Sequence, residues 1–552
     1  MKVEHKRSYR VMVLSFFLVL FLSSPAFEAE TKNEESEANK NLINVEVEGI
    51  IQKKDGDTVT LPLRLALEIA LEHNLDIQIE KIRVPIAEEV IIEKEARFDP
   101  ALFGEATNRR FEQQTSSALS GTPIFKENEQ HGRVGTRKLF RFGLEAESYF
   151  ENSRYRANSS FEGLDPQYKN FLVLTVRQPL LQDFGPKVNT TDINVAKNDR
   201  EIIKNIFLLQ VMETLNQVEQ TYYDLSGMNE TLQLRRESLR LAEKILSDNR
   251  KRFDAGLTHI GEVQEAETAV ASREEEVISA HQTMKDVTNI FKNVLQVRPE
   301  SPLYPLMIQT EGFFPSEKEI PSYEESFREA LTRRPDYLQK KIEVESREVI
   351  LKFNKNHLLP RLDLVGTFGL NGLSGEAQTI TFAGQSARNP FGGGYADSWE
   401  HLLEGDGYEW NIGLTIEIPL GNRADRSRYQ QSELYKQQAI MDLKNLEDKI
   451  DLDIKVAIEN IRSSRDRIEV AERFVSLAAK TLSQEEERKK AGLSDTFRVL
   501  NFQEDLMDAK IRKVRALVDY QKALAQLYKS MGTNLERHEM SLNIPECSTS
   551  LQ

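Results

Sequence analysis

The chain of 552 residues carries 73 basic and 88 acidic side chains, for a net charge of −15, and 39% of its residues are hydrophobic. A mean hydropathy of −0.50 excludes a bundle of many membrane-spanning helices, and the acidic balance argues against a nucleic-acid partner, whose phosphates the protein would repel. The single cysteine, Cys547, excludes internal disulfides and cysteine-rich zinc sites.

The N-terminus has the pattern of a secretory signal peptide. Basic residues within 2–10 precede an apolar run over 11–22, and small residues at Ser24 and Ala26 suit cleavage by a signal peptidase. The run is too short for an ordinary transmembrane helix, although a retained signal anchor is the alternative. We therefore predict a signal peptide over 1–26, followed by a flexible, acidic segment over 27–60.

The rest of the sequence contains two copies of one pattern. A glycine turn over 252–258 recurs over 488–494, and each turn follows a stripe of apolar residues spaced by seven. The stripes are Val218, Leu225, Leu232, Leu239 and Leu246 in the first copy and Ile454, Ile461, Ile468, Val475 and Leu482 in the second. We predict repeat 1 over 61–298, a Pro-rich linker over 299–321, repeat 2 over 322–532 and a C-terminal tail over 533–552.

Each copy is predicted to begin with a helix and to continue into strands. The helices are expected over 63–97 and 323–357, and Pro85 should kink or restart the first of them. Residues 362–370 and 412–418 alternate between apolar and polar, and residues 171–176 are apolar on both faces, as in strands. Since the chain is exported and Trp410 lies near a strand end, this pattern favours a membrane barrel over a soluble sandwich.

A further hairpin pattern covers residues 132–155, with a turn near Gly143. It has no counterpart in the second copy. We therefore expect a loop or an elaboration inside the lumen, and not two additional barrel strands. That expectation leaves two strands per copy and four per chain. A four-stranded sheet in lipid would have unpaired edges, so the barrel requires several chains.

Long helices follow the strands. Residues 187–252 and 422–490 lack proline and predict helices of roughly 100 Å at 1.5 Å per residue, against about 30 Å for a hydrocarbon core. Return helices are expected over 261–297 and 495–531, after the turns at Gly256 and Gly492. The seven-residue stripes predict that these rods pack side by side as coiled coils beyond the membrane.

The doubled order of helix, strands, long helix, glycine turn and return helix resembles the TolC-like outer-membrane efflux family over residues 61–533. The motifs that carry the resemblance cover residues 176–181, 330–336, 358–362 and 418–420 together with the two Ala-Gly-Leu turns. The resemblance implies a mixed α/β membrane protein, a homotrimer whose shared outer-membrane β-barrel continues as a long α-helical coiled-coil barrel in the periplasm.

The resemblance also implies a function and its partners. The protein would be the passive exit duct of a tripartite efflux or type I secretion system, energised by an inner-membrane transporter through a periplasmic adaptor. The alternative is an exported periplasmic coiled-coil scaffold or adaptor with a soluble β domain. The cargo can be a drug, a metal ion, a polysaccharide or a protein, because the pump selects it.

Two sets of site residues follow from this resemblance. The first would dock the adaptor at the hairpin tips: Ala255, Gly256, Leu257, Ala491, Gly492 and Leu493. The second would line a periplasmic gate: Glu262, Glu265, Asp495, Arg498 and Asn501. Arg498 and Asn501 stand where the family has carboxylates, whereas Glu262 and Glu265 are spaced to share a helix face. The alternative is that the gate residues are ordinary solvated side chains on a polar helix.

The sequence contains no recognisable catalytic pattern. It has neither a GxxxxGK[ST] phosphate loop nor a GxSxG nucleophile motif, and its eight histidines include no pair four residues apart. We therefore predict that the protein is not an enzyme and has no cofactor and no metal site.

Overall fold

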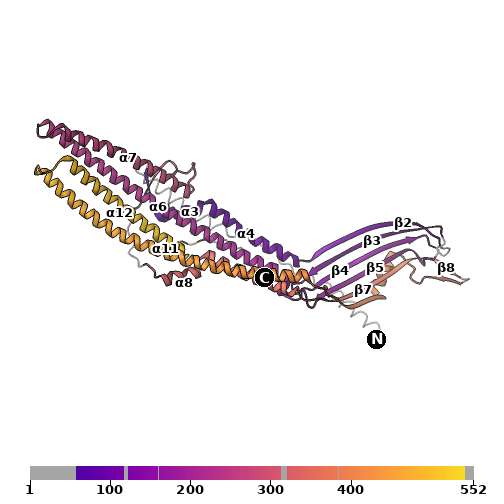
Figure 1. Cartoon of the computed structure of the whole chain (residues 1–552). Coiled ribbons are helices and arrows are strands. Elements are labelled where there is room, and N and C mark those ends of the chain that lie inside the picture. The colour runs from indigo at the N-terminus through magenta and orange to yellow at the C-terminus, as the bar shows by residue number, and fades with distance from the viewer. Residues whose placement is uncertain are drawn as a thin grey trace.

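The computed structural model describes residues 58–116, 122–159, 161–312, 320–382, 385–540 and 542. The predicted signal peptide and Cys547 lie outside these residues. The molecule is long and narrow, with a sheet at one end and helices that project from it toward the other end (Figure 1). No helix in the described part of the chain is both long and apolar enough to cross a membrane.

Four helices form most of the length of the molecule. Two long helices, α6 (Thr191–Asp254, 64 residues) and α11 (Arg423–Lys490, 68 residues), are each followed by a return helix, α7 (Ile260–Val294) or α12 (Thr496–Met531). The predicted extents are confirmed to within a few residues, because neither long segment contains a proline to interrupt the helical hydrogen bonds.

The glycine turns end the long helices as predicted. Gly256 and Gly492 have φ angles of 72° and 74°, in the left-handed region that glycine adopts without a steric penalty. The next amide, of Leu257 or Leu493, donates to a carbonyl of the last helical turn at 2.8 or 2.9 Å. Each turn therefore reverses the chain within a few residues.

The seven-residue stripes lie inside the hairpins. Val218, Leu225, Ile454 and Ile461 are fully buried, and the remaining stripe residues are buried or half-buried. Two separate cores result. One joins α6 and α7 to the first helices of the chain, and the other joins α11 and α12 to α8 (Tyr323–Arg333). The coiled-coil packing that the spacing predicts is therefore present within each hairpin.

The first helix of each half is divided, but not at the predicted residue. The first half has α3 (Leu63–His73) and α4 (Leu75–Glu95), with the break at Asn74, whose side chain accepts the amides of residues 76 and 77. Of the kink or restart expected at Pro85, the restart is wrong, because α4 continues through this residue. Asn74 begins α4 because its side chain satisfies two amides of the first turn that have no partner within the helix.

The second half is divided at the corresponding position. Here α8 ends at Arg333 and α9 (Pro335–Asn356) begins two residues later. Residue 334 precedes a proline and is extended, as the proline ring requires of its predecessor.

Short elements close the ends of the first core. Strand β1 (Thr58–Leu61) pairs in parallel with β6 (Met307–Thr310), so part of the Pro-rich segment is a strand and not merely a connection. The buried Tyr222 bridges the two, since its hydroxyl donates to Leu61 O and accepts from Glu311 N, both at 3.1 Å. Near the C-terminus, α13 (Asn534–Arg537) packs on α6.

The main sheet contains six antiparallel strands in the order β10-β7-β5-β4-β3-β2. Their bounds are β2 Ala101–Gln114, β3 Ile124–Leu139, β4 Glu145–Ala157, β5 Leu164–Pro179, β7 Arg361–Ala377 and β10 Gly407–Glu417. The hairpin expected to be a loop or a lumenal elaboration therefore supplies β3 and β4, and the expectation of four strands per chain is wrong. The hairpin lies between β2 and β5, where β3 forms backbone hydrogen bonds with β2 and β4 forms them with β5.

Smaller elements surround the two ends of the sheet. The 3₁₀ turn η1 (Ala96–Phe98) and the short helix α5 (Pro186–Asn189) lie next to the helical end, while β8 (Thr379–Phe382), β9 (Gln385–Arg388) and α10 (Tyr395–Glu404) follow β7 at the other end. Helix α10 packs directly on the sheet because Gly372 has no side chain: a Cβ there would lie 2.0 Å from Ser398 O.

Candidate pore wall and docking tips

One face of the main sheet carries a network of charged side chains. Arg177 on β5 binds Asp363 on β7 at 2.8 Å and Glu145 on β4 at 3.0 Å. Farther along, His131 on β3 lies 3.3 Å from Glu151 on β4. These side chains lie on one face because the strands pair in register, and together they connect four strands with polar contacts.

The opposite face is apolar along the same strands. On β10, Trp410, Ile412, Leu414 and Ile416 are 62–71% exposed. On β5 and β7 the band continues with leucines and phenylalanine, where Leu174 is the register partner of Phe368. A sheet with one charged and one apolar face suits a wall that has water on one side and hydrocarbon on the other.

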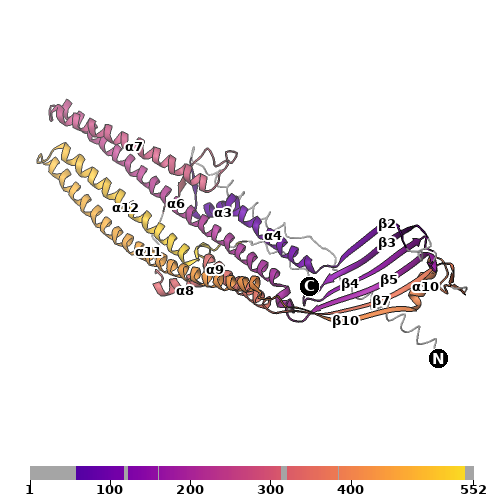
Figure 2. The same cartoon turned by 45° about the vertical axis from the view of Figure 1, so that its right-hand side comes forward.

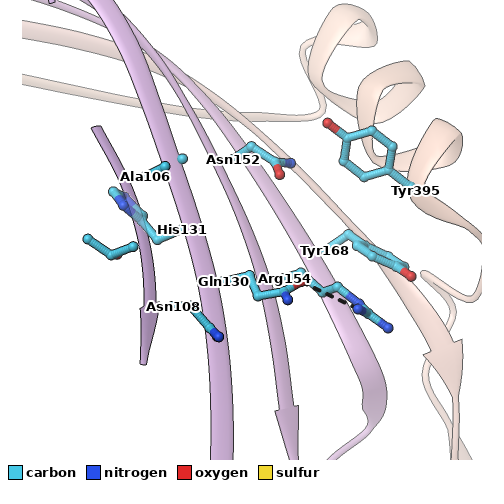
Figure 3. A pocket seen from close by; sticks show the side chains of 10 residues that line it. Ala106, Asn108, Gln130, His131, Asn152, Arg154, Tyr168 and Tyr395 are labelled. Atoms are coloured by element: carbon cyan, nitrogen blue, oxygen red, sulfur yellow. Dashed lines mark hydrogen bonds between the residues drawn. The ribbon is translucent and has the colours of Figure 1, made fainter. Parts of the chain in front are cut away.

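Farther from the helices, the apolar band ends where α10 crosses the sheet. Trp399 stacks on Phe150 with ring centroids 4.4 Å apart, and Tyr395 meets Tyr168 edge to face at 5.6 Å. Beside this contact lies an open hollow of about 560 Å³, lined mainly by polar side chains of β2–β5 and by Tyr395 of α10 (Figure 3). Figure 3 also shows Arg154 bound to Gln130. The lining side chains include no nucleophile paired with a base.

Among the described residues, His401, Glu404 and Asp406 form one group whose ligand atoms lie within 4.8 Å of one another. Asp406 follows the helix end at Gly405, so the spacing of three and then two residues was not a recognisable metal motif. Two of the three side chains are exposed, and His401 Nδ1 lies 3.5 Å from Asp406 Oδ2. His401 and Asp406 form an ion pair only when the histidine is protonated.

The predicted docking residues lie at the end of the molecule farthest from the sheet (Figure 2). The two tips lie close together, and all six residues are exposed, with Leu257 and Leu493 each 70% accessible. Two exposed leucines at adjacent helix tips form a small apolar surface at the position that the sequence predicts for a partner.

The candidate gate residues divide into two groups. Glu262 accepts a hydrogen bond at 2.7 Å from Thr496, which is fully buried and also accepts from Asn249 and Lys489. Asp495 caps α12 by accepting the Arg498 amide at 2.9 Å. The other three residues, Glu265, Arg498 and Asn501, are exposed. Glu262 therefore joins the two hairpins of one chain and does not share an exposed face with Glu265.

The contact of Glu262 with Thr496, Asn249 and Lys489 is called the Glu262 junction below. It was not visible in the sequence because its members lie far apart along the chain. Burial alone would raise the pKa of Glu262, but hydrogen bonds from Thr496 and Thr258 and the charges of Lys489 and His259 lower it below its ordinary value of 4.5. Burial lowers the pKa of Lys489, because it disfavours the charged ammonium group, and the attraction of Glu262 opposes this shift. The junction thus depends on an ionised carboxylate.

Comparison with known proteins places this arrangement in a family. Residues 150–289 and 327–533 match the family model described as outer membrane efflux protein. The outer membrane efflux protein BepC of Brucella suis is 25% identical over 321 residues, which cover 58% of this chain and 63% of BepC, less than two thirds of that relative.

Solved structures share the fold at low sequence identity. The CmeC outer membrane channel of Campylobacter jejuni matches with a TM-score of 0.59 and 16% identity, over 86% of each chain. The outer membrane protein VceC of Vibrio cholerae matches with a TM-score of 0.58 and 16% identity, over 85% of this chain and 96% of VceC. The chain belongs to the outer membrane efflux protein family, which confirms the resemblance inferred from its sequence.

The Glu262 junction predicts a pH-dependent separation of the hairpin tips. Since the folded pKa of Glu262 is lowered, the contact is complete above about pH 4.5 and is lost as the pH falls through the folded pKa. Spin labels at the exposed positions 254 and 490, in a Cys547→Ser background, should report longer distances in acid. Glu262→Gln should abolish this change, and Glu265→Gln should retain it. An acid response that persists in Glu262→Gln would contradict the assignment.

Proposed function

We propose that the protein is the passive exit duct of a tripartite efflux or type I secretion system. Three copies build one outer-membrane β-barrel, which continues as a helical tunnel across the periplasm to an adaptor and an inner-membrane transporter. The transporter supplies the energy and selects the cargo, and the protein supplies the path.

The observation that carries this proposal is the direct continuation of an amphipathic sheet into very long helices. At 1.5 Å per residue, the 68 residues of α11 extend about 100 Å, three times the thickness of a hydrocarbon core. The helices therefore lie outside the membrane, and within the described residues the main sheet has the apolar band that lipid requires. This length suits a duct that reaches toward the opposite membrane.

Exposed apolar surface supports an assembly of several copies. Five residues along α11 are 56–70% exposed although they are large and apolar: Leu434, Met441, Leu452, Val470 and Leu477. They lie on the solvent side of the same helix whose other stripe packs inside the hairpin. A second copy of the chain covers them in the proposed trimer, as the helices assemble around a common axis.

The two-repeat division is supported by the paired hairpins. The family model matches one segment in each half, and each match contains one long helix and most of its return helix. We place the boundary between repeats in the Pro-rich segment over 299–321. In the assembly, each chain therefore supplies two hairpins to the tunnel wall.

The alternative, an exported scaffold with a soluble β domain, does not account for the apolar face of β10. A soluble sandwich would cover that face with a second sheet, whereas Ile412 is 71% exposed and no second sheet lies over it in the described part of the chain. Membership of the outer membrane efflux family points in the same direction.

Fractionation of cells tests the proposed function directly. The protein should sediment with outer membranes, require detergent for extraction and migrate as a heat-labile trimer on gels. A maltose-binding protein exported in parallel serves as the soluble control. Recovery as a soluble periplasmic monomer would overturn the duct proposal and support the scaffold.

The hairpin tips are proposed to dock the adaptor. Replacing both Leu257 and Leu493 by Asp should reduce adaptor pull-down and efflux at least tenfold, because it puts charge on the apolar tips. Both side chains are exposed, so the trimer and its membrane location should be unchanged. Leu257→Ala with Leu493→Ala should have a smaller effect. Unchanged pull-down in the Asp variant would exclude docking at the tips.

Arg498 is proposed to face the narrow entrance of the tunnel near these tips. Its charge would be repeated around the axis, so Arg498→Glu should raise cation selectivity and increase the open probability in planar bilayers. Arg515→Glu makes the same charge change about 25 Å farther along α12 and should have a smaller effect. Equal currents and selectivity in wild type and Arg498→Glu would place this residue away from the pore.

A further inference from the structure

The β3–β4 hairpin is hydrogen-bonded into the sheet on both sides. All 14 residues of β2 have a register partner in β3, and β4 pairs with β5 from Glu145↔Arg177 to Tyr155↔Gln167. The hairpin therefore separates β2 from β5 along the whole length of the sheet. If it left the sheet, two long rows of backbone groups would lose their partners.

The hairpin also has the same two faces as the rest of the sheet. Its outward residues beside the apolar band are uncharged except Lys138 at the helical end: Gly132, Val134 and Thr136 on β3, and Ala146, Ser148 and Phe150 on β4. On its other face, Arg133 binds Glu147 and lies 3.6 Å from the ring of Tyr149. Glu145 continues these contacts to Arg177 on β5. A loop folded into the lumen would not need one largely uncharged face beside the apolar band.

The two edges of the sheet are compatible with each other. Because the sheet has an even number of antiparallel strands, its edge strands β2 and β10 run in opposite directions. Both edge strands are largely exposed, and no strand in the described ranges pairs with their outer sides. The β2 edge of one copy can therefore pair with the β10 edge of the next in antiparallel fashion, and the ring can close.

We propose that β3 and β4 belong to the pore wall, so that a trimer closes an eighteen-stranded exit barrel. The inference rests on the proposed trimeric duct and specifies its outer part. Barrel diameter grows roughly linearly with strand number, so this barrel is about 1.5 times as wide as one built from four strands per chain. The charged face, with His131, Arg133 and Glu147, then lines the lumen.

The wider wall sets the size limit at the outer mouth, whereas the transporter selects the cargo. Its lumenal face presents both signs of charge, many of them paired, so it attracts neither anions nor cations strongly. The added width then matters more than charge. The exit admits bulky hydrophilic solutes that a twelve-stranded wall would exclude.

Cysteine cross-linking in a Cys547→Ser background tests the strand order. Leu414→Cys on β10 is combined in turn with Leu102→Cys, Gly104→Cys, Ala106→Cys and Asn108→Cys on the same face of β2. At least one pair should give disulfide-linked trimers. The same four β2 cysteines combined with Leu174→Cys on β5 should give no cross-link within one chain, because the hairpin lies between them. Thr136→Cys with Ser148→Cys, which are register partners, is the positive control.

The β2–β10 and β2–β5 cross-links test different claims. Without any β2–β10 cross-link between chains, the shared barrel and hence the proposed duct would be overturned. If β2–β10 cross-links form but β2 also links to β5, the duct stands and the hairpin is outside the wall, which overturns only the eighteen-stranded barrel.

Polymer exclusion measures the width of the exit. Polyethylene glycols of graded size are added from the extracellular side, where the barrel mouth decides which ones enter and alter the current. Deleting residues 122–157 removes β3 and β4 and leaves β2 and β5 antiparallel neighbours. The excluded diameter should fall to about two thirds of the wild-type value. An unchanged cut-off in a folded deletion variant would contradict the proposal, and cross-linking of the full-length protein decides it if the variant does not fold.

Discussion

The open edges of the six-stranded sheet are the constraint on which the rest of this structure depends. Strand β10 carries exposed Trp410 and Ile412, so this sheet faces lipid in the proposed assembly, and lipid cannot hydrogen-bond an unpaired edge. Each unpaired peptide group would cost several kcal/mol there. In the proposed assembly, other copies therefore satisfy the β2 and β10 edges, and the helices that continue from the strands follow the same symmetry.

The helices also require neighbouring chains, in their case to cover exposed apolar side chains. On α11, Ile454 and Ile461 pack inside the hairpin, while Leu452 and Val470 on another side of the helix remain exposed. The buried residues stabilise the hairpin of one chain, and the exposed residues need a neighbouring chain to cover them. Backbone pairing at one end and apolar packing along the rods thus favour the same assembly of several copies.

The sequence predicted the elements whose signals are local. Long proline-free segments and a seven-residue stripe are sufficient to place α6 and α11. Glycine marks the tips because the turns there need a residue with a positive φ angle. It did not predict the place of β3 and β4, since both faces of this hairpin contain polar residues. Arg133 and Glu147 become recognisable as a lumenal pair only after the strands are aligned. The contact of Glu262 with Thr496 is equally non-local.

That contact bears on how a duct of this kind would open. Thr496 is buried between the hairpins and is held by Glu262, Asn249 and Lys489, so the two tips of one chain are joined by polar groups with little access to water. Separating them would expose several hydrogen bonds at once, whereas the side chains of Arg498 and Glu265 are already exposed. In the proposed trimer, the weaker boundary at the narrow end therefore lies between chains. An adaptor that binds both leucine tips of one chain would move them as a unit, and it would widen the entrance without first opening the Glu262 junction.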